Sequence, residues 1–331
     1  MPLVKLSNDR EFSASEGGSL LDAALSAGIT LPHSCKTGRC TTCKCKVLQG
    51  ETTILHPETG LTASEKAEGW ILSCVRSTQE DISIEVEDFG DVILPPRKTL
   101  PCRIGAIDQL SSDIVRVILR LPPRADFRSI PGQYIDVIGP GGVRRSYSLA
   151  NANTSGNNLE LHIRSVDGGV MSDYWFKEAK VNDLLRFNGP LGTFFLRSLA
   201  NINLVFLATG TGIAPVKAML ESLTNIAPEQ APLSVTVFWG GRTAEDLYFE
   251  LESINKDHRF VPVLSRPAEG WVGARGYVQN AMLSTHQDVS NTVVYACGSL
   301  AMIRSAKAGL LAVGLPEKRF FADAFVPSAA H

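Results

Sequence analysis

Short segments in which hydrophobic and polar residues alternate occur throughout the first two hundred residues of the chain. Residues 82–86, 115–121, 134–138 and 159–165 show this period of two, which is typical of half-buried β-strands. Between residues 102 and about 197 such segments are separated by turns rich in glycine, proline, asparagine and serine. Short strands punctuated in this way indicate an antiparallel sandwich or barrel.

The pattern changes from residue 203 onward. Continuous apolar runs occupy residues 204–208, 235–239, 260–264 and 293–296, and a helical pattern begins near residue 216. Strands of this kind that alternate with helices predict a parallel, doubly wound sheet.

The length and the linker composition suggest a multidomain protein. A chain of 331 residues holds two or three domains at roughly 100–200 residues each. The run Leu94-Pro95-Pro96-Arg97-Lys98 has the composition of a stiff linker, because consecutive prolines interrupt ladder hydrogen bonding. We therefore expect domains at residues 1–92, 101–198 and 199–331.

The overall composition excludes several classes of function. The net charge is −2 and 44% of the residues are hydrophobic, so no basic excess points to nucleic acid. The apolar runs are far shorter than the roughly 20 residues that span a bilayer, and the N-terminus has no apolar signal-peptide region. Seven cysteines in such a chain favour metal ligands or reactive thiols over disulfides. We expect a cytoplasmic protein that is a monomer when free.

Four cysteines carry the most specific chemical signal. Cys35, Cys40, Cys43 and Cys74 have the spacing C-x4-C-x2-C…C, which is the plant-type ligand pattern of a [2Fe–2S] cluster. A zinc site is the alternative, but zinc ribbons usually pair two C-x2-C knuckles and only one occurs here. Cys45 is an additional thiol that we interpret as a packed free cysteine, with alternative ligation left open.

Charge is distributed unevenly around these cysteines. Residues 1–92 carry 8 Lys and Arg against 14 Asp and Glu, a net charge of −6, whereas the remainder carries 24 against 20. Nevertheless Lys36, Arg39, Lys44 and Lys46 lie within the cysteine-rich loop. We hypothesise a basic rim at which an electron-accepting protein docks; ordinary solvated side chains are the alternative.

A flavin site is indicated by two motifs. In the run Arg145-Ser146-Tyr147-Ser148, Arg145 offers a fork of donors to a phosphate, Tyr147 can cover a flat ring, and Ser148 offers a small hydroxyl. Downstream, glycines in the stretch 168–172 precede a helical pattern, and a helix N-terminus favours a pyrophosphate. The four-residue motif is weak alone, since Tyr147 could be a core residue.

A nicotinamide site is indicated by glycine turns. Gly210, Thr211 and Gly212 follow a strand and open a helix, in the pattern G-x-G-x-x-P, which departs from the usual dinucleotide fingerprint. After the next strand, Arg242 could accept the 2′-phosphate of NADPH, whereas Asp246 could bind the free ribose hydroxyl of NADH. We favour NADH and leave dual use open; a solvated loop arginine is the alternative for Arg242.

Taken in order, these motifs resemble the ferredoxin–NADP⁺ reductase superfamily, specifically its members with an N-terminal plant-type ferredoxin domain. The resemblance covers essentially the whole chain. It implies an α+β ferredoxin-like (β-grasp) domain, an antiparallel β-barrel FAD domain and an α/β parallel-sheet nicotinamide domain. The cofactors it implies are FAD, a [2Fe–2S] cluster and NADH or NADPH.

The resemblance also implies roles for individual residues. Ser148, Cys297 and Asp323 would be catalytic, with Ser148 facing flavin N5, Cys297 over the nicotinamide and Asp323 at the family's acidic position. The residues implied to contact FAD are Arg145, Tyr147, Ser148, His162, Ile163, Arg164, Gly169, Val170, Met171, Ser172 and Phe325, of which Phe325 would shield the ring. Those implied to contact the nicotinamide dinucleotide are Gly210, Thr211, Gly212, Arg242, Asp246, Cys297 and Gly298.

The implied activity is electron transfer from NAD(P)H through FAD and the cluster to a separate acceptor protein. The segments 20–29, 33–36, 145–151 and 321–325 look like those of CDP-6-deoxy-Δ3,4-glucoseen reductases, which serve a dehydrase in dideoxysugar biosynthesis. The reductase component of a ring-hydroxylating dioxygenase or multicomponent monooxygenase is the alternative. A non-enzymatic redox sensor would need no complete hydride path, so the combined motifs favour an enzyme.

Overall fold

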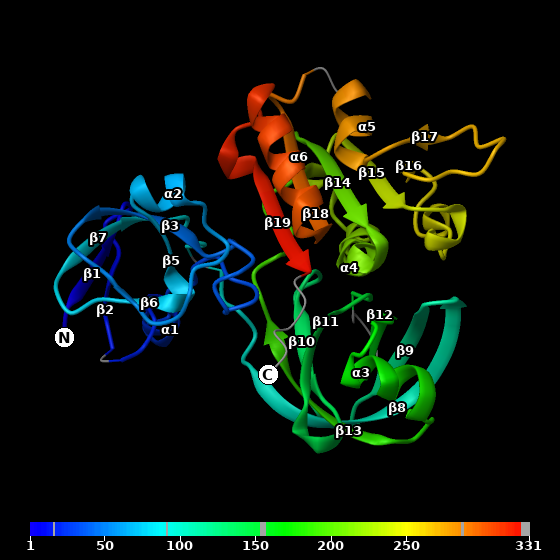
Figure 1. Ribbon diagram of the computed structural model, residues 1–331, viewed down its shortest axis with the longest axis horizontal. Helices are drawn as coiled ribbons and strands as arrows, with labels where there is room; N and C mark the ends of the chain where they lie inside the picture. Colours follow the sequence, from blue (N-terminus) through cyan, green and yellow to red (C-terminus); the bar gives the residue numbers. More distant parts are fainter. Residues whose placement is uncertain (16, 91, 153–156, 286–287, 326–331) are drawn as a thin grey trace. The chain divides into compact units, whose positions relative to one another are not determined.

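The computed structural model describes residues 1–15, 17–90, 92–152, 157–285 and 288–325. The chain divides into two compact units, Met1–Leu94 and Pro95–His331, whose elements are labelled in Figure 1. No helix within the described ranges combines the length and the apolar character needed to cross a membrane.

The first unit is built on a five-stranded mixed sheet. Its strands are β1 (Leu3–Leu6), β2 (Glu11–Ser13), β3 (Lys44–Gln49), β5 (Trp70–Leu72) and β7 (Ile82–Glu85), in the order β2-β1-β7-β3-β5. The β1–β7 pair is parallel, and the other pairs are antiparallel. The remaining elements are α1 (Leu20–Ser26), α2 (Ala63–Ala67), the short 3₁₀ helix η1 (Ser73–Val75) and a separate pair, β4 (Thr53–Ile54) with β6 (Arg76–Ser77).

Helix α1 follows from local sequence signals. Ser19 caps its N-terminus, with the hydroxyl accepting a hydrogen bond from Asp22 N at 3.1 Å, and Gly28 ends it with φ +75°, which glycine adopts at little cost. The helix packs its apolar face into a core that also contains Cys43, Cys45 and Cys74. The cysteine-bearing segments are thus anchored by a well-packed core.

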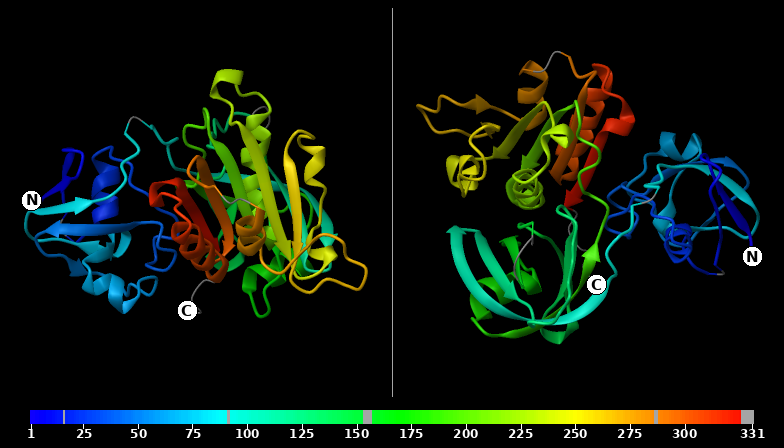
Figure 2. Two further views of the ribbon diagram at one scale, coloured as in Figure 1. Left: turned by 90° about the horizontal axis from the view of Figure 1, so that it is seen from above. Right: turned by 180° about the vertical axis from the view of Figure 1, so that it is seen from behind.

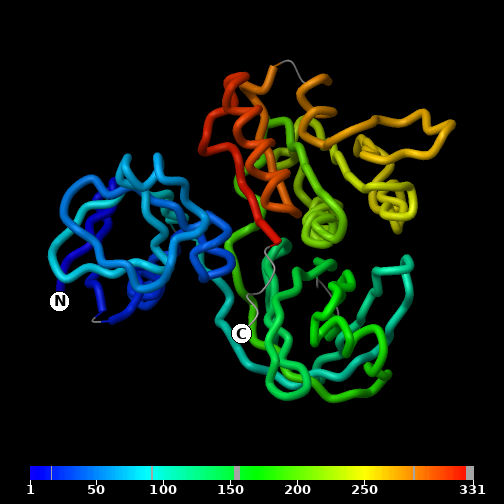
Figure 3. The backbone as a smooth tube through the Cα atoms, in the orientation of Figure 1, coloured from blue at the N-terminus to red at the C-terminus, as the bar shows by residue number. Residues whose placement is uncertain are grey.

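The first half of the second unit is an antiparallel sheet. It comprises β8 (Lys98–Ser111), β9 (Ile114–Arg120), β10 (Tyr134–Ile138), β11 (Arg144–Ser148), β12 (Asn158–Arg164) and β13 (Leu184–Leu191), in the order β11-β10-β13-β8-β9-β12. The long strand β8 pairs with β13 along its first residues and with β9 along the rest, and its curve is visible in Figure 3. The short helix α3 (Val170–Asp173) and the π-helical turn η3 (Tyr174–Glu178) precede β13.

The antiparallel sheet expected from the sequence is confirmed, whereas the expected barrel is not seen to close among the described residues. Among the described residues, β11 and β12 meet only through an isolated bridge between Leu149 and Leu161. Just beyond that bridge, the carbonyl of Ala150 accepts a hydrogen bond from Lys217 and the amide of Ala152 donates to Glu221. Ala150 also contacts β12, because its amide donates a hydrogen bond to Glu160 O at 2.8 Å.

The second half of this unit is a six-stranded sheet in which every pairing is parallel. Its strands are β14 (Asn203–Thr209), β15 (Ser234–Gly241), β16 (Arg259–Leu264), β17 (Ala274–Arg275), β18 (Thr292–Ser299) and β19 (Phe320–Phe325), in the order β17-β16-β15-β14-β18-β19. Figure 2 shows the common direction of the strands. The turns are 3₁₀ helices: η4 (Gly210–Gly212), η5 (Pro228–Gln230), η6 (Ala244–Asp246), η7 (Leu251–Ser253) and η8 (Glu317–Arg319).

Three helices accompany this sheet. The side chains of Leu204, Phe206 and Ala208 share one face of β14, since they are two residues apart, and they pack against α4 (Ile213–Leu223). Helices α5 (Val278–Thr285) and α6 (Leu300–Ala312) pack against each other, as Figure 1 shows. Helix α4 begins directly after the glycine turn η4 at the carboxyl end of β14, the edge at which ligands bind in open parallel sheets.

Candidate functional site

The four predicted cluster ligands come together as two pairs. The thiol of Cys43 lies 3.1 Å from that of Cys74. A hydrogen bond from Cys40 lowers the pKa of Cys35. All the cysteines are free thiols. Within the described ranges no group of three or more His, Cys, Asp or Glu side chains is gathered to hold a single metal ion. Pairs of thiols suit a two-iron cluster, in which each iron takes two protein ligands.

Backbone N–H groups of the loop point at these sulfurs. The amide of Thr37 lies 3.4 Å from Cys35 Sγ, and a backbone hydrogen bond from Gly38 helps lower the pKa of Cys74, after the larger contribution of the Cys43 thiol. Gly38 has φ +74°, and a Cβ there would lie 2.6 Å from Pro57 O, so only glycine fits. Two pairs of thiols with backbone donors aimed at sulfur suit the donor set of a [2Fe–2S] cluster.

Cys45 is placed apart from the pairs. It is fully buried in the core of the first unit, and burial raises the pKa of its thiol to about 12. Its neighbour across the sheet is Ile71. The thiol is therefore protonated and packed among apolar side chains, as free cysteines commonly are.

A buried ion pair beside the cysteines was not anticipated from the sequence. The carboxylate of Glu58, with a fully buried side chain, pairs with Arg76 Nη2 at 2.6 Å and accepts a hydrogen bond from Leu72 N at 2.7 Å. It fastens the segments on both sides of Cys74. No sequence signal identifies such a pair, since 18 positions separate its members.

The hypothesised basic rim is partly neutralised by neighbouring acids. Lys36 Nζ lies 3.1 Å from Asp22, and Lys44 Nζ lies 2.8 Å from Glu65 and 4.1 Å from the centroid of the Trp70 ring. The rim therefore stays a hypothesis, with less free charge than the sequence suggests.

The residues predicted to hold the flavin lie on and beside β11. Arg145 has no carboxylate partner among the described residues and donates to Arg144 O, so its guanidinium fork is open to a phosphate. Tyr147 accepts a hydrogen bond from Trp175 Nε1 at 3.0 Å, and burial raises its pKa to about 12. Ser148 is buried at the end of the strand. A neutral, anchored tyrosine beside a small hydroxyl suits an aromatic cofactor.

The second flavin motif forms the start of α3. Gly169 is the N-cap residue, Val170 is exposed and Met171 is buried. The hydroxyl of Ser172 accepts a hydrogen bond from Val166 N at 2.9 Å, so it also shapes its own loop. These four residues lie on the short segment that follows β12 and supply exposed backbone near a helix start.

The three predicted β12 residues have different surroundings. Ile163 belongs to the apolar core of this half. The ring of His162 is buried and contacts Tyr248 and Glu160, and burial lowers its pKa, so the ring is neutral at pH 7. Arg164 faces the second half and pairs with Asp246 at 2.8 Å. The role of these three residues along the flavin stays a prediction.

Gly212 in the glycine turn and Gly298 beside it have no space for a Cβ. Gly210 has φ +54°, a Cβ on Gly212 would lie 2.3 Å from Cys297 O, and a Cβ on Gly298 would lie 2.1 Å from Thr209 Oγ1. Trp239 Nε1 donates to Gly210 O at 3.0 Å. The turn with Thr211 thus brings backbone N–H groups to the carboxyl ends of β14, β15 and β18, which suits a pyrophosphate.

The C-terminal residues lie beside this turn. Cys297 is paired in register with Asp323 across β18 and β19, as Ser299 is with Phe325. Burial, with a smaller contribution from the charge of Asp323, raises the pKa of the Cys297 thiol well above its ordinary value, so it stays protonated. Phe325 is partly exposed; the six residues that follow it lie outside the described ranges, and its stacking role stays a prediction.

The two candidates for the ribose site differ in availability. Both carboxylate oxygens of Asp246 already accept hydrogen bonds, from Arg164 Nη2 at 2.8 Å and from Arg242 N at 2.7 Å. The side chain of Arg242 is more than half exposed. Arg242, with Arg266 and Asp246, lines a cavity of about 260 Å³. The preference for NADH over NADPH therefore stays a prediction. Arg242, which would bind a 2′-phosphate, has a more exposed side chain than Asp246, which would bind the ribose hydroxyl.

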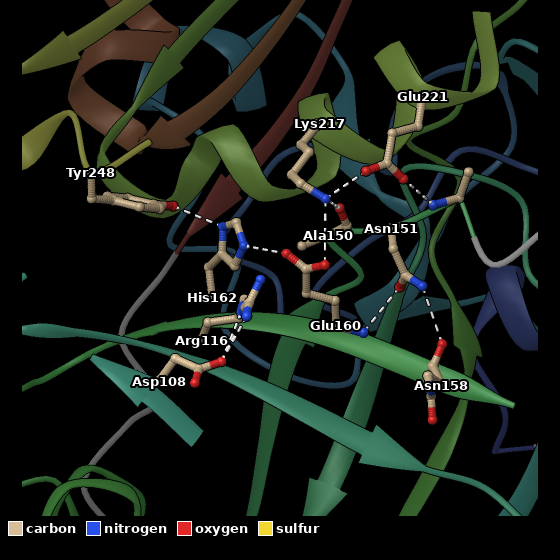
Figure 4. Close-up of polar contacts among 11 residues, drawn as sticks. Asp108, Arg116, Ala150, Asn151, Asn158, Glu160, His162, Lys217, Glu221 and Tyr248 are labelled. Carbon is tan, nitrogen blue, oxygen red and sulfur yellow. Dashed lines mark hydrogen bonds and ion pairs between the residues drawn. The ribbon is translucent and has the colours of Figure 1, made fainter. Parts of the chain in front are cut away.

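A buried polar network that the sequence did not reveal joins the two halves of this unit (Figure 4). It runs through Tyr248, His162, Glu160, Lys217 and Glu221. Lys217 and Glu221, spaced i,i+4 on α4, have the pattern of an ordinary solvated helix face, so no sequence signal marked them.

The chain is similar to known proteins over its three predicted domains. Three family models match: the 2Fe-2S iron-sulfur cluster binding domain over residues 4–77, the oxidoreductase FAD-binding domain over 101–196 and the oxidoreductase NAD-binding domain over 206–308. The chain is 42% identical over 330 residues to the CDP-6-deoxy-L-threo-D-glycero-4-hexulose-3-dehydrase reductase of Yersinia pestis, with 98% of both chains covered. It is 32% identical to the xylene/toluene monooxygenase electron transfer component XylA of Pseudomonas putida, over 95% of this chain and 91% of that one.

A solved structure is similar to the chain over its full length. The crystal structure of the Amycolatopsis reductase GcoB covers 99% of both chains with a TM-score of 0.77 and 30% identity. The chain therefore belongs to the iron–sulfur flavoprotein reductases of the ferredoxin–NADP⁺ reductase superfamily, with 2Fe-2S, FAD-binding and NAD-binding domains, as its sequence motifs imply.

Proposed function

We propose that this protein is an NAD(P)H-dependent reductase that supplies electrons to a CDP-6-deoxy-hexulose 3-dehydrase in dideoxysugar biosynthesis. The observation that carries the proposal is the 42% identity to the Yersinia pestis dehydrase reductase over 98% of both chains. FAD and the [2Fe–2S] cluster, when bound, supply the chemistry that divides a two-electron donor into single electrons.

The chain's own residues bind and orient these groups. Cys35, Cys40, Cys43 and Cys74 hold the cluster. Arg145 binds a phosphate of FAD, Tyr147 orients the ring system, and Ser148 presents its hydroxyl to the reacting edge. Support comes from the open guanidinium of Arg145, the anchored Tyr147 hydroxyl and the two thiol pairs.

The nicotinamide side is proposed in the same way. Gly210, Thr211 and Gly212 bind the pyrophosphate, while Cys297 holds the nicotinamide ring close to the flavin without acting as a nucleophile. The protonated state of this thiol supports the assignment. Asp323 lies beside it in the sheet and is the proposed acidic group of the site.

Reconstitution with the proposed acceptor tests the function. The purified holoprotein, the dehydrase, its CDP-6-deoxy-hexulose substrate and NADH are combined under anaerobic conditions, and NADH oxidation is measured together with the deoxygenated sugar. We expect sustained NADH oxidation and sugar formation to require all four components, and Cys74→Ser to abolish sugar formation while NADH still bleaches the flavin. A purified wild-type protein with flavin but without iron and sulfide would refute the proposal.

Electron supply to an oxygenase is the second candidate. The full-length similarity to the monooxygenase component XylA supports it. A parallel reaction in which an oxygenase component replaces the dehydrase distinguishes the two, since the true acceptor saturates at low concentration while the other accepts electrons slowly.

We also propose domain limits, state and location for the chain. Domains at 1–92, 101–198 and 199–331 are supported by the extents of the three family matches, and we assign the β-grasp and barrel folds to the first two. The free thiol state of all seven cysteines supports a cytoplasmic location. We propose a monomer in the absence of its acceptor, which gel filtration tests.

A further inference from the structure

Helix α4 carries two charged residues, one turn apart, that contact the flavin half of the second unit. Lys217 and Glu221 form an i,i+4 pair at 2.5 Å. Exposed pairs of this kind contribute little to stability. Here, however, the Lys217 side chain is 16% exposed, which sets it apart from a solvated helix face.

Every donor of Lys217 has a partner, and two of these partners belong to the other half. The ammonium lies 3.0 Å from Ala150 O, 3.4 Å from a carboxylate oxygen of Glu160 and 2.5 Å from Glu221. The second oxygen of Glu221 accepts from Ala152 N at 2.9 Å. An ammonium has three protons, so the group is fully satisfied, and α4 is joined to the chain on both sides of residue 151 (Figure 4).

The network continues from Glu160 back to the nicotinamide half. His162 Nε2 lies 2.8 Å from Glu160, and Nδ1 lies 3.0 Å from the Tyr248 hydroxyl. Because Glu160 accepts and the tyrosine donates, the neutral ring carries its proton on Nε2. Tyr248 packs edge-on against Trp239, with ring centroids 5.1 Å apart, and Trp239 donates to Gly210 O. These contacts therefore connect Gly210 to Lys217, which lies on the helix that follows the same glycine turn.

Lys217 and Ala150, which bond to each other, are each close in the chain to one of the two binding motifs. Lys217 lies five residues beyond Gly212 in the chain, about 7.5 Å along a helix. Ala150 lies two residues beyond Ser148, about 7 Å along an extended strand. Short rigid segments therefore connect the Lys217–Ala150 hydrogen bond to both motifs.

We infer that Lys217 is a positioning residue that sets the separation of the nicotinamide site from the flavin site through its bonds to Ala150 and Glu160. The inference rests on the proposed function of the two sites. Lys217 touches neither cofactor site itself, so its loss changes the alignment of the bound groups and leaves their binding contacts in place. Misplacement by about 1 Å at a reacting centre costs up to about a hundredfold in rate.

Stopped-flow reduction of the holoprotein by NADH tests this inference with Lys217→Met. We expect the limiting rate of flavin bleaching to fall at least about tenfold, while the NADH concentration for half-maximal rate changes less than about twofold. The long-wavelength charge-transfer absorbance of the nicotinamide–flavin pair, which depends on their separation, should fall with the rate. Lys217→Arg keeps donors for Ala150 O and the carboxylates and should restore both quantities.

A matched control removes another lysine ion pair from the same unit. Lys307 pairs with Glu317 at 2.7 Å within the nicotinamide half alone, so Lys307→Met should leave the rate and the absorbance at wild-type values. Equal rates and equal absorbance for Lys217→Met and Lys307→Met would overturn the inference. If Lys217→Met fails to retain FAD, Glu221→Gln tests the inference in its place. This variant weakens the contact with Lys217 but keeps an acceptor for Ala152 N. We expect it to reduce the charge-transfer absorbance, and wild-type absorbance would overturn the inference. Rapid bleaching of the wild-type flavin by NADH tests the proposed function separately.

Discussion

Replacing Gly212 by alanine tests the glycine turn with a single methyl group. Gly212 has φ −59° and ψ −13°, values that alanine adopts freely, so no backbone strain enters. In such positions Gly→Ala otherwise stabilises a protein by about 0.4–1 kcal/mol. Any loss of stability in Gly212→Ala is therefore due to steric overlap of the new methyl group with its neighbours.

The new methyl group would lie about 1 Å closer to its nearest neighbour than an ordinary contact allows. The added Cβ would lie 2.3 Å from Cys297 O, 2.7 Å from Cys297 C and 3.0 Å from Gly298 Cα, whereas ordinary contacts begin at 3.4 Å. All three atoms belong to the backbone of β18, which cannot turn aside as a side chain can. Overpacking of this kind costs about 1–3 kcal/mol, so we expect a net loss of about 1–2 kcal/mol after the entropic gain.

The rate of flavin reduction should fall by more than the loss of stability alone would cause. A shift of about 1 Å between the turn and Cys297 displaces both the pyrophosphate site and the residue proposed to lie at the nicotinamide, and such misplacement costs up to about a hundredfold in rate. Stopped-flow bleaching of the flavin by NADH measures this effect, while FAD content and the thermal transition show whether the fold is retained. Gly309→Ala is the control, because its Cβ meets only the movable Leu283 side chain, at 3.0 Å. Wild-type reduction kinetics in Gly212→Ala would refute the steric reasoning.

Three further predictions address the cofactor preference, the extra cysteine and the pH dependence. Arg242→Ala should lower kcat/KM for NADPH by about tenfold or more relative to NADH, because a charge-assisted hydrogen bond contributes about 1.5–3 kcal/mol; equal losses with both would exclude a 2′-phosphate contact. Cys45→Ala should retain full iron and sulfide content whereas Cys74→Ser should not, as measured on purified protein. Burial alone would raise the pKa of Glu65, but hydrogen bonds from Lys44 and Thr62 outweigh it and lower the pKa to about 2. The stabilising effect of the Lys44–Glu65 pair should therefore be complete above pH 4.5 and lost as the pH falls towards 2, so the difference in thermal stability between wild type and Lys44→Met should disappear over that range.

The sequence predicted the features that depend on neighbouring residues. The cysteine spacing indicated the thiol pairs because three of the four ligands lie within nine residues. The residues of the glycine turn were identifiable because a turn between strand and helix needs close backbone approach, which the 2.3 Å contact at Gly212 makes plain. Ser19 and Gly28 marked the ends of α1 for the same local reason.

Features that join distant segments could not be predicted. Asp246 matched a ribose-binding position, but its carboxylate is engaged by Arg164, 82 residues away. Lys217 had the spacing of a solvated helix residue, and only the tertiary structure places Ala150 O and Glu160 around it. The strand pattern of residues 102–197 likewise suggested an antiparallel sandwich or barrel, but it could not show that the backbone of Ala150 and Ala152 bonds to α4.

The short proline linker affects how well a free ferredoxin can compete with the chain's own first unit for electrons from the flavin. The first unit ends at Leu94 and keeps its own core, and Arg97 is bonded to Asn188 within the second unit, so the free link between the two is limited to residues 94–96, roughly 10 Å at the extended rise of proline-rich chain. Because the two units are covalently linked, their encounter is intramolecular and does not depend on protein concentration. We therefore expect a free ferredoxin to compete poorly for the flavin unit.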